Sequence, residues 1–208
     1  EAARLPSYAG LIMLGNLYEY RSVKEIQYLE KARSCYEQAL SLISADDSSR
    51  YAEKRLNSFY DFTDSTTGQP IYYKILSAQE KTVAIWPKSI ISYNDPEGEL
   101  VLPEFVKYKG EKYRLVSIGA NAFKNNKKLK KVVIGKNVTK IGKKAFYGCS
   151  KLKKITVKTT KLTKKNVGSQ AFKGIHKKAA FKVPKKKISS YRKVFRARGA
   201  AKTTKVTK

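Results

Sequence analysis

The feature of the sequence that most constrains its fold is a unit repeated in the C-terminal half. An Ile/Val-Gly-x-x-Ala-Phe segment occurs three times, the second copy 23 residues after the first and the third 26 residues later. A recurring period with several apolar positions in phase is the sequence signature of an architecture in which each unit stacks on the next. The repeated positions are Ile118, Gly119, Ala122 and Phe123; Ile141, Gly142, Ala145 and Phe146; and Val167, Gly168, Ala171 and Phe172.

Each unit also carries an apolar pair fourteen and sixteen residues after its first position. The pairs are Val132 and Ile134, Ile155 and Val157, and Phe181 and Val183. Because alternate side chains of a strand point to the same face, each pair predicts a short strand. The glycine is expected to permit the turn that enters the opposite face. Stacked units would pair their strands into a parallel sheet and place Phe123, Phe146 and Phe172 in one column, with no unit stable alone.

The segments on either side of these repeats (residues 117–183) carry their own signals. Period-two alternation and turn residues within residues 70–116 predict strands over 71–76, 82–86 and 100–102 and a hairpin of 105–108 and 113–116. Residues 184–208 are expected to form a basic cap, which begins after Pro184 ends the last strand. Ser189 or Ser190 is expected to N-cap a helix that runs to about Arg198, with Gly199 at its end.

The N-terminal module, residues 1–60, is predicted to be helical and to be followed by a polar linker at 61–69. Apolar residues at helical spacing predict two helices within residues 7–43, with small residues that let them approach closely. The patterns Leu14-Gly15-x-x-Tyr18 and Ala32-x-x-x-Tyr36-x-x-Ala39 resemble one tetratricopeptide repeat of the longer, Sel-like type. The alternative is an amphipathic helical hairpin of no special family, since a single repeat cannot bury its own faces.

The repeats of the C-terminal half resemble the BspA-like leucine-rich repeats of bacterial and some protist surface proteins. The unit of that family reads roughly I-G-x-x-A-F-x-x-C-x-x-L-x-x-I-x-I. Cys149 occupies its cysteine position, Asn126 replaces the cysteine in the preceding unit, and Ile175-His176 leaves the turn of the third unit open. The resemblance extends over about residues 98–208. It implies a short leucine-rich-repeat β-solenoid. Together with the flanking segments, the expected fold is α+β: an N-terminal α-hairpin, then the solenoid with a β-hairpin lead-in, and a C-terminal helical cap.

Positive charge is concentrated in the second half of the chain. Residues 105–208 hold 34 Lys and Arg against one acidic residue, whereas residues 1–104 hold 11 against 15. In stacked units, equivalent lysines would lie about 4.8 Å apart and form ladders of like charge. The alternative is that they only solubilise and protect exposed strands. The candidate contacts for a polyanion or other partner are Lys127, Lys128, Lys130, Lys131, Lys151, Lys153, Lys154, Lys177, Lys178 and Lys182.

The sequence predicts no catalytic, cofactor-binding or metal-ligating residue. It has no G-x-S-x-G, P-loop or G-x-G-x-x-G motif, and its one histidine, His176, lacks the paired cysteine spacing of a zinc site. Cys35 and Cys149 are expected to be buried free thiols, with one long-range disulfide as the alternative. No apolar run reaches the roughly 20 residues that span a bilayer.

Two functional interpretations follow from these features. The first is a non-catalytic binding scaffold whose partner is a protein or an anionic glycan; the family resemblance implies adhesion and a location at the bacterial cell surface or outside the cell. The alternative is an intracellular polyanion- or RNA-binding protein, which the basic half would suit. Specific nucleic-acid recognition is not expected, because the repeats have no aromatic side chains among their lysines for base stacking.

Overall fold

A computed structural model describes residues 7–21, 27–42, 62–64, 71–87 and 95–208 of the chain. Contacts divide the chain into two compact units: Glu1–Phe59 with Ser89–Tyr93, and Tyr60–Lys88 with Asn94–Lys208. The predicted boundary at residue 60 lies outside the described residues, as does most of the predicted linker. Each unit is therefore considered by itself.

The first unit contains the two predicted helices, α1 (Tyr8–Arg21) and α2 (Gln27–Ser41). The small-against-large packing is confirmed at Gly15, where a Cβ atom would lie only 2.8 Å from the ring of Tyr36. The hydroxyl of Tyr36 donates a 2.6 Å hydrogen bond to the side-chain oxygen of Asn16. Ala32 and Cys35 of the same helix are buried as well as Tyr36. A bulkier residue at position 15 would push the helices apart, because its side chain would overlap the ring of Tyr36.

The second unit begins with sheet A, which contains the predicted strands over 71–76, 82–86, 105–108 and 113–116, whereas the strand predicted over 100–102 belongs to sheet B. Its order is β1 (Phe62–Asp64), β2 (Ile71–Ser77), β3 (Thr82–Trp86), β6 (Glu111–Ile118) and β5 (Phe105–Tyr108), with β8 (Lys140–Ile141) paired to β6. The antiparallel hairpin β5–β6 confirms the predicted hairpin, and the two strands predicted over 71–76 and 82–86 are present as β2 and β3, which pair antiparallel. The assignment of residues 61–69 as a linker was wrong in part, because β1 pairs antiparallel with β2.

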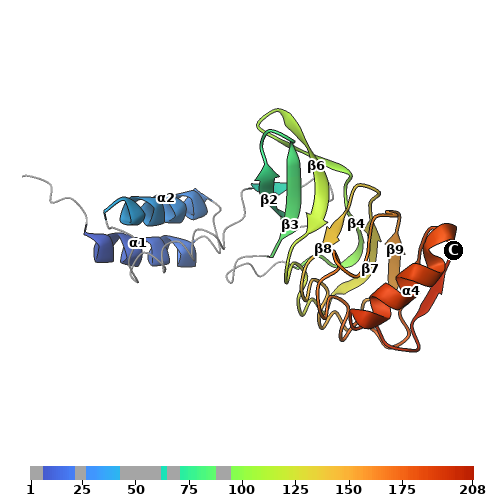
Figure 1. The fold of residues 1–208 in the computed structure, drawn as a ribbon. Coiled ribbons are helices and arrows are strands. Elements are labelled where there is room, and N and C mark those ends of the chain that lie inside the picture. The colour runs from blue at the N-terminus through green and yellow to red at the C-terminus, as the bar shows by residue number, and fades with distance from the viewer. Residues whose placement is uncertain (1–6, 22–26, 43–61, 65–70, 88–94) are drawn as a thin grey trace, which may run out of the picture. The chain divides into compact units, whose positions relative to one another are not determined.

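Sheet B is a ladder of parallel strands, one from each successive coil of the chain (Figure 1). Its order is β4 (Gly98–Val101), β7 (Leu129–Ile134), β9 (Lys154–Val157), β10 (Ala180–Lys182) and β11 (Lys205–Thr207). Val132 pairs with Ile155, and Phe181 pairs with Ile155 from the other side, as the repeat register predicted. Val183 lies beyond the end of β10, and its N–H donates to the carbonyl of Thr207.

The turns opposite sheet B stack as regularly as the strands. The N–H of Phe123 donates to the carbonyl of Ala145, and that of Phe146 to the carbonyl of Ala171, both at 2.8 Å. The ring centroids of Phe123 and Phe146 are 5.2 Å apart, and those of Phe146 and Phe172 are 5.7 Å apart. All three rings are buried, which confirms the predicted phenylalanine column.

The repeated glycine has a different role from the one expected. None of Gly119, Gly142 and Gly168 adopts a positive φ. Instead, a Cβ atom on Gly142 would lie 2.3 Å from the backbone nitrogen of Ala120 in the preceding turn, and one on Gly168 would lie equally close to that of Lys143. The glycine is needed because neighbouring coils approach each other too closely there for any side chain.

The C-terminal cap, predicted over residues 184–208, contains more secondary structure than the predicted helix. A short 3-10 helix (Lys185–Lys187) leads into α4 (Ile188–Ala197), and Gly199 follows with a φ of +99°. The predicted serine N-cap was wrong: Lys187 occupies that position without a capping side chain. The strand β11 was not predicted, and it adds a further rung to sheet B.

The helix α4 packs on the last coils through aromatic side chains. Phe195 stacks on Phe181 with centroids 4.3 Å apart and meets Phe172 edge-on. The hydroxyl of Tyr191 donates to the carbonyl of Thr159 and accepts from the N–H of Leu162, so the helix is tied to the loop before the third repeat. The turn of that repeat is retained, with the N–H of His176 donating to the carbonyl of Leu152.

Candidate binding site on the outer face of sheet B

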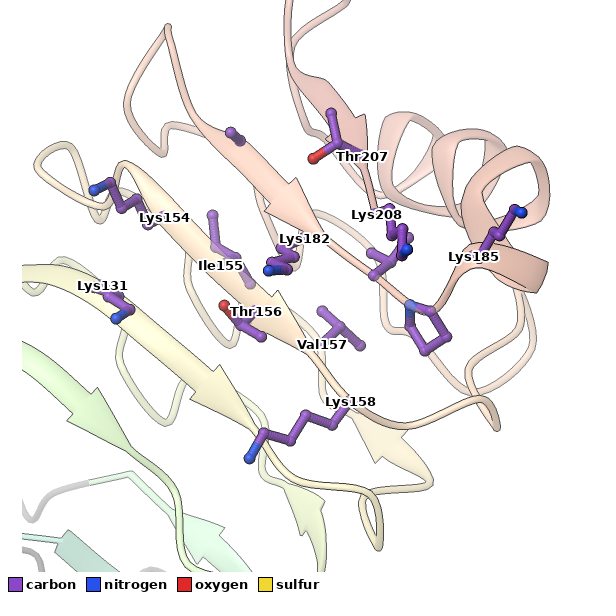
Figure 2. A pocket seen from close by; sticks show the side chains of 13 residues that line it. Lys131, Lys154, Ile155, Thr156, Val157, Lys158, Lys182, Lys185, Thr207 and Lys208 are labelled. Atoms are coloured by element: carbon purple, nitrogen blue, oxygen red, sulfur yellow. The ribbon is translucent and has the colours of Figure 1, made fainter.

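The outer face of sheet B carries a pocket of about 850 Å³ (Figure 2). Residues from three adjacent strands, β9, β10 and β11, line it together with Lys131 of β7 and the segment that leads to α4. The lining residues are Lys131, Lys154, Ile155, Thr156, Val157, Lys158, Ala180, Lys182, Val183, Pro184, Lys185, Thr207 and Lys208. Six of them are lysines and none is acidic or aromatic, so the pocket is suited to an anionic ligand.

Strand alternation explains why these lysines face outward. Ile155 is buried, and its neighbours Lys154 and Thr156 point to the opposite face of the sheet. The parallel register then places equivalent residues side by side on neighbouring strands. One row runs Glu99, Lys131, Lys154, Ala180 and Lys205, and the next runs Val101, Val133, Thr156, Lys182 and Thr207.

Two acidic side chains, Glu99 in β4 and Glu104 in the segment after it, lie at the β4 end of this sheet. Glu99 is 2.6 Å from the ammonium of Lys131, and Glu104 is 3.1 Å from that of Lys136. Among the described residues, no carboxylate side chain lies within ion-pair distance of the other five pocket lysines. Positive charge therefore increases along the sheet from β4 toward β11.

A second pocket, of about 320 Å³, lies between α4 and β11. It is lined by Arg192, Arg196, Lys202, Thr203, Thr204, Lys205, Val206 and Thr207. Arg196 donates a 2.9 Å hydrogen bond to the carbonyl of Lys202, and this bond holds its guanidinium against the turn before β11. Thr207 lines both pockets, so the two lie on either side of one strand.

The structure brings together three of the ten lysines proposed from the sequence: Lys131, Lys154 and Lys182. Of the others, Lys127 donates to the carbonyl of Gly148, and Lys128 lies 3.9 Å from Glu97. The remaining five are exposed and line neither pocket; they are Lys130, Lys151, Lys153, Lys177 and Lys178.

Sequence reasoning missed the residues that complete the two pockets. They are Lys158, Lys185 and Lys208 in the first pocket, and Arg192, Arg196, Lys202 and Lys205 in the second. Lys158 directly follows the strand β9, and the equivalent positions of the other two units hold Gly135 and Pro184, so no repeated lysine marked it. The others belong to α4 and β11 or their flanks, where the cap departs from the repeat and β11 was not expected.

The two unusual side chains of the repeat turns have structural partners. The thiol of Cys149 is buried and donates to the carbonyl of Phe123 at 3.0 Å, and burial raises the pKa of Cys149 to about 12. Asn126 fills the equivalent position one coil earlier, donating to the carbonyl of Pro96 and accepting from two backbone N–H groups. Both cysteines are buried free thiols, and burial also raises the pKa of Cys35.

The described residues hold no group of three or more His, Cys, Asp and Glu side chains that could bind a metal ion. Within the same residues, no helix is both long and apolar enough to cross a bilayer. The Nδ1 atom of His176 accepts a 3.1 Å hydrogen bond from the N–H of Lys178, so the histidine has a local role in its turn.

Comparison with known proteins identifies the repeats. The family model described as "BspA type Leucine rich repeat region" matches residues 113–207 in six copies, and the fold is leucine-rich-repeat-like, with mixed α/β content and few helices. That family consists generally of non-catalytic binding scaffolds, and the match indicates no enzyme family. No match was found among curated proteins.

Three solved structures are similar to the chain. A leucine-rich cell surface protein from Faecalibacterium prausnitzii is 24% identical over 60% of this chain and 36% of its own, with a TM-score of 0.42. A leucine-rich repeat protein from Bacteroides ovatus is 24% identical over 61% and 38%, with a TM-score of 0.41. One from Bacteroides capillosus is 14% identical over 69% and 97%, with a TM-score of 0.41. The chain thus spans little more than a third of the first two proteins.

Proposed function

We propose that the BspA-type repeats form a short solenoid that acts as a non-catalytic binding scaffold at the cell surface or outside the cell. The outer face of sheet B is the binding face in this proposal. The repeat match over residues 113–207 supports the scaffold and its surface location. The observation that carries the binding face is the pocket on sheet B, where lysines from successive strands converge.

The partner proposed for this face is anionic. Six lysines line the pocket, and only Lys131 has a carboxylate at ion-pair distance among the described residues. Lysines that only solubilise the edge of a sheet need not cluster around one pocket. A binding site for a polyanion requires such a cluster of positive charge. Anionic glycans and acidic proteins both satisfy this requirement, and adhesion is the biological role that the family suggests.

The test is retention of the full-length chain on a heparin column. A variant with Lys154, Lys158, Lys182 and Lys185 changed to Gln should elute at clearly lower salt, because fewer counterions are released on binding. The matched control changes Lys124, Lys143, Lys165 and Lys173, which are exposed and line neither pocket. Equal elution of the two variants would show that the lysines act only through net charge.

The alternative function, intracellular binding of nucleic acid, would favour aromatic side chains on the same face, on which bases could stack. Neither pocket lining contains Phe, Tyr, Trp or His, so successive bases would find no stacking platform.

The resemblance of α1 and α2 to a single Sel-like repeat remains a proposal that rests on their sequence pattern alone.

A further inference from the structure

We propose that the two pockets form one continuous track for a single linear anionic polysaccharide, which crosses β11 at Thr207. This inference rests on the proposed function and extends it, because it adds a second contact region beyond the sheet and names the class of ligand. The first region is the pocket on sheet B, here called the sheet pocket, and the second is the pocket beside α4, here called the cap pocket.

The strand β11 is the wall that the two pockets share. Its central residue, Val206, is buried, whereas Lys205 and Thr207 on either side of it are exposed. Thr207 lines both pockets, Lys205 lines the cap pocket, and Lys208 lines the sheet pocket. A polysaccharide that lies on the outer face of sheet B can therefore pass over β11 and reach α4 while it stays in contact with basic side chains.

Charge along this track favours a ligand with many negative groups in sequence. The two linings together contain ten Lys and Arg side chains and no acidic residue: Lys131, Lys154, Lys158, Lys182, Lys185 and Lys208 in the sheet pocket, and Arg192, Arg196, Lys202 and Lys205 in the cap pocket. In the described part of the chain, the carboxylate side chain at ion-pair distance from a pocket lysine is that of Glu99, beside Lys131 at the far end. Lys131 and Lys154 are paired on adjacent strands about 4.8 Å apart, so their ammonium groups repel each other until a bound polyanion neutralises them.

The side-chain chemistry distinguishes a polysaccharide from the other polyanions. Binding hot spots between proteins are enriched in Trp, Tyr and Arg and depleted of Lys, whereas the sheet pocket holds six lysines and no aromatic residue. The absence of aromatic residues from both linings also removes the stacking that holds single-stranded nucleic acid. Lysine is a point charge on a flexible stem, which suits sulfates or carboxylates at irregular positions. The hydroxyls of Thr156, Thr203 and Thr207 can bond sugar hydroxyls between the charges.

A bipartite track makes binding depend on ligand length. Short oligosaccharides occupy the sheet pocket alone, and only those long enough to pass β11 gain the contacts of the cap pocket. Because the second contact is then intramolecular, affinity should rise sharply over a narrow range of lengths and then level off.

The experiment measures the affinity of the full-length chain for size-fractionated heparin oligosaccharides of increasing length, at fixed salt. The variant Lys202→Gln/Lys205→Gln should bind the short fragments as the unchanged chain does and the longest ones about tenfold more weakly. The variant Lys182→Gln/Lys185→Gln should weaken binding at every length. The control Lys124→Gln/Lys143→Gln carries the same change in net charge outside both pockets.

The outcomes separate this inference from the proposed function. If Lys202→Gln/Lys205→Gln affects short and long fragments equally, or affects neither, the continuous track is refuted while the sheet pocket stands. If Lys182→Gln/Lys185→Gln binds like the control at every length, the proposed function itself fails. Oligothymidylate of matched charge is the competing ligand, and binding as tight as that of the longest oligosaccharide would overturn the assignment to polysaccharide.

Discussion

The carboxylate of Glu99 lies 2.6 Å from the ammonium of Lys131 on the outer face of sheet B. The register that makes them neighbours places Lys154, rather than a second acid, on the other side of Lys131. The charge of Lys131 is thus neutralised by Glu99, whereas the pocket lysines on the later strands have no carboxylate side chain at ion-pair distance among the described residues. The basic face begins where this ion pair ends.

Replacing Glu99 with Gln should therefore strengthen heparin binding, because Lys131 then contributes a full charge to the pocket. The cost in stability should stay below about 1 kcal/mol, since the pair is partly exposed to solvent. Heparin-column elution and urea denaturation measure the two effects. Glu111→Gln is the control, because Glu111 pairs with Lys81, which lines neither pocket. Elution at the same salt for both variants would contradict the role of Glu99.

The phenylalanine column gives a stability prediction. Phe146→Ala should lower the free energy of unfolding by about 3–5 kcal/mol, because it removes a fully buried ring stacked between two others. Trp86 is the only tryptophan of the chain and lies in β3 of the same unit, so its fluorescence follows unfolding there. Phe105→Ala is the matched control, since Phe105 is 42% exposed and its replacement should cost much less. Equal losses for the two variants would argue against the column as a core.

Close packing of the coils at the repeated glycine is tested with alanine. Gly142→Ala should destabilise the second unit by about 1–3 kcal/mol, because the new methyl group would overlap the backbone of Ala120. Gly135→Ala adds the same group where the nearest atom is 3.5 Å away, and it should be tolerated. Urea denaturation followed by Trp86 fluorescence compares them. A Gly142→Ala chain as stable as Gly135→Ala would mean that the coils can separate at no cost.

The fold of the repeats could be predicted because the same apolar positions recur in each unit. A register error of one residue would have placed Val132 and Ile155 in solvent, so the pattern allowed one solution. The function of the glycine could not be read in the same way. Positive φ and close approach both favour glycine, and only the neighbouring coil shows which applies at Gly142.

The candidate site was predictable only where it coincides with the repeat. Lys131 and Lys154 occupy equivalent positions of successive units, and the sequence placed them in one row. The cap pocket depends on β11, whose single buried apolar residue, Val206, lies between polar residues and gives little strand signal. Lys130 and Lys153 were grouped with the site because the sequence does not show which lysines near the start of a strand line the pocket; Lys130 lies within β7 and Lys153 directly before β9.

The buried thiol of Cys149 makes stability depend on pH. The pKa of an unfolded cysteine is about 8.5, and burial raises that of Cys149 to about 12. Above the unfolded value, the unfolded chain loses a proton that the folded chain keeps, so stability falls with rising pH by up to about 1.4 kcal/mol per unit. The destabilisation caused by Cys149→Ala should therefore shrink between about pH 8 and pH 10. Urea denaturation followed by Trp86 fluorescence measures this difference, and a difference between Cys149→Ala and the unchanged chain that does not vary with pH would contradict it.

Reversing one charge in the lysine row separates binding from stability. In Lys154→Glu the new carboxylate lies beside Lys131 on the neighbouring strand, where it replaces a like-charge contact with an opposite-charge one. The free energy of unfolding should stay the same or rise by up to about 1 kcal/mol. Heparin binding should nevertheless weaken more than in Lys143→Glu, which makes the same change in net charge on an exposed turn outside both pockets. If Lys154→Glu instead loses stability and binding together, the lysine row supports the fold. A loss of binding from a chain that is at least as stable would mean that the row is kept, despite its mutual repulsion, for the ligand it holds.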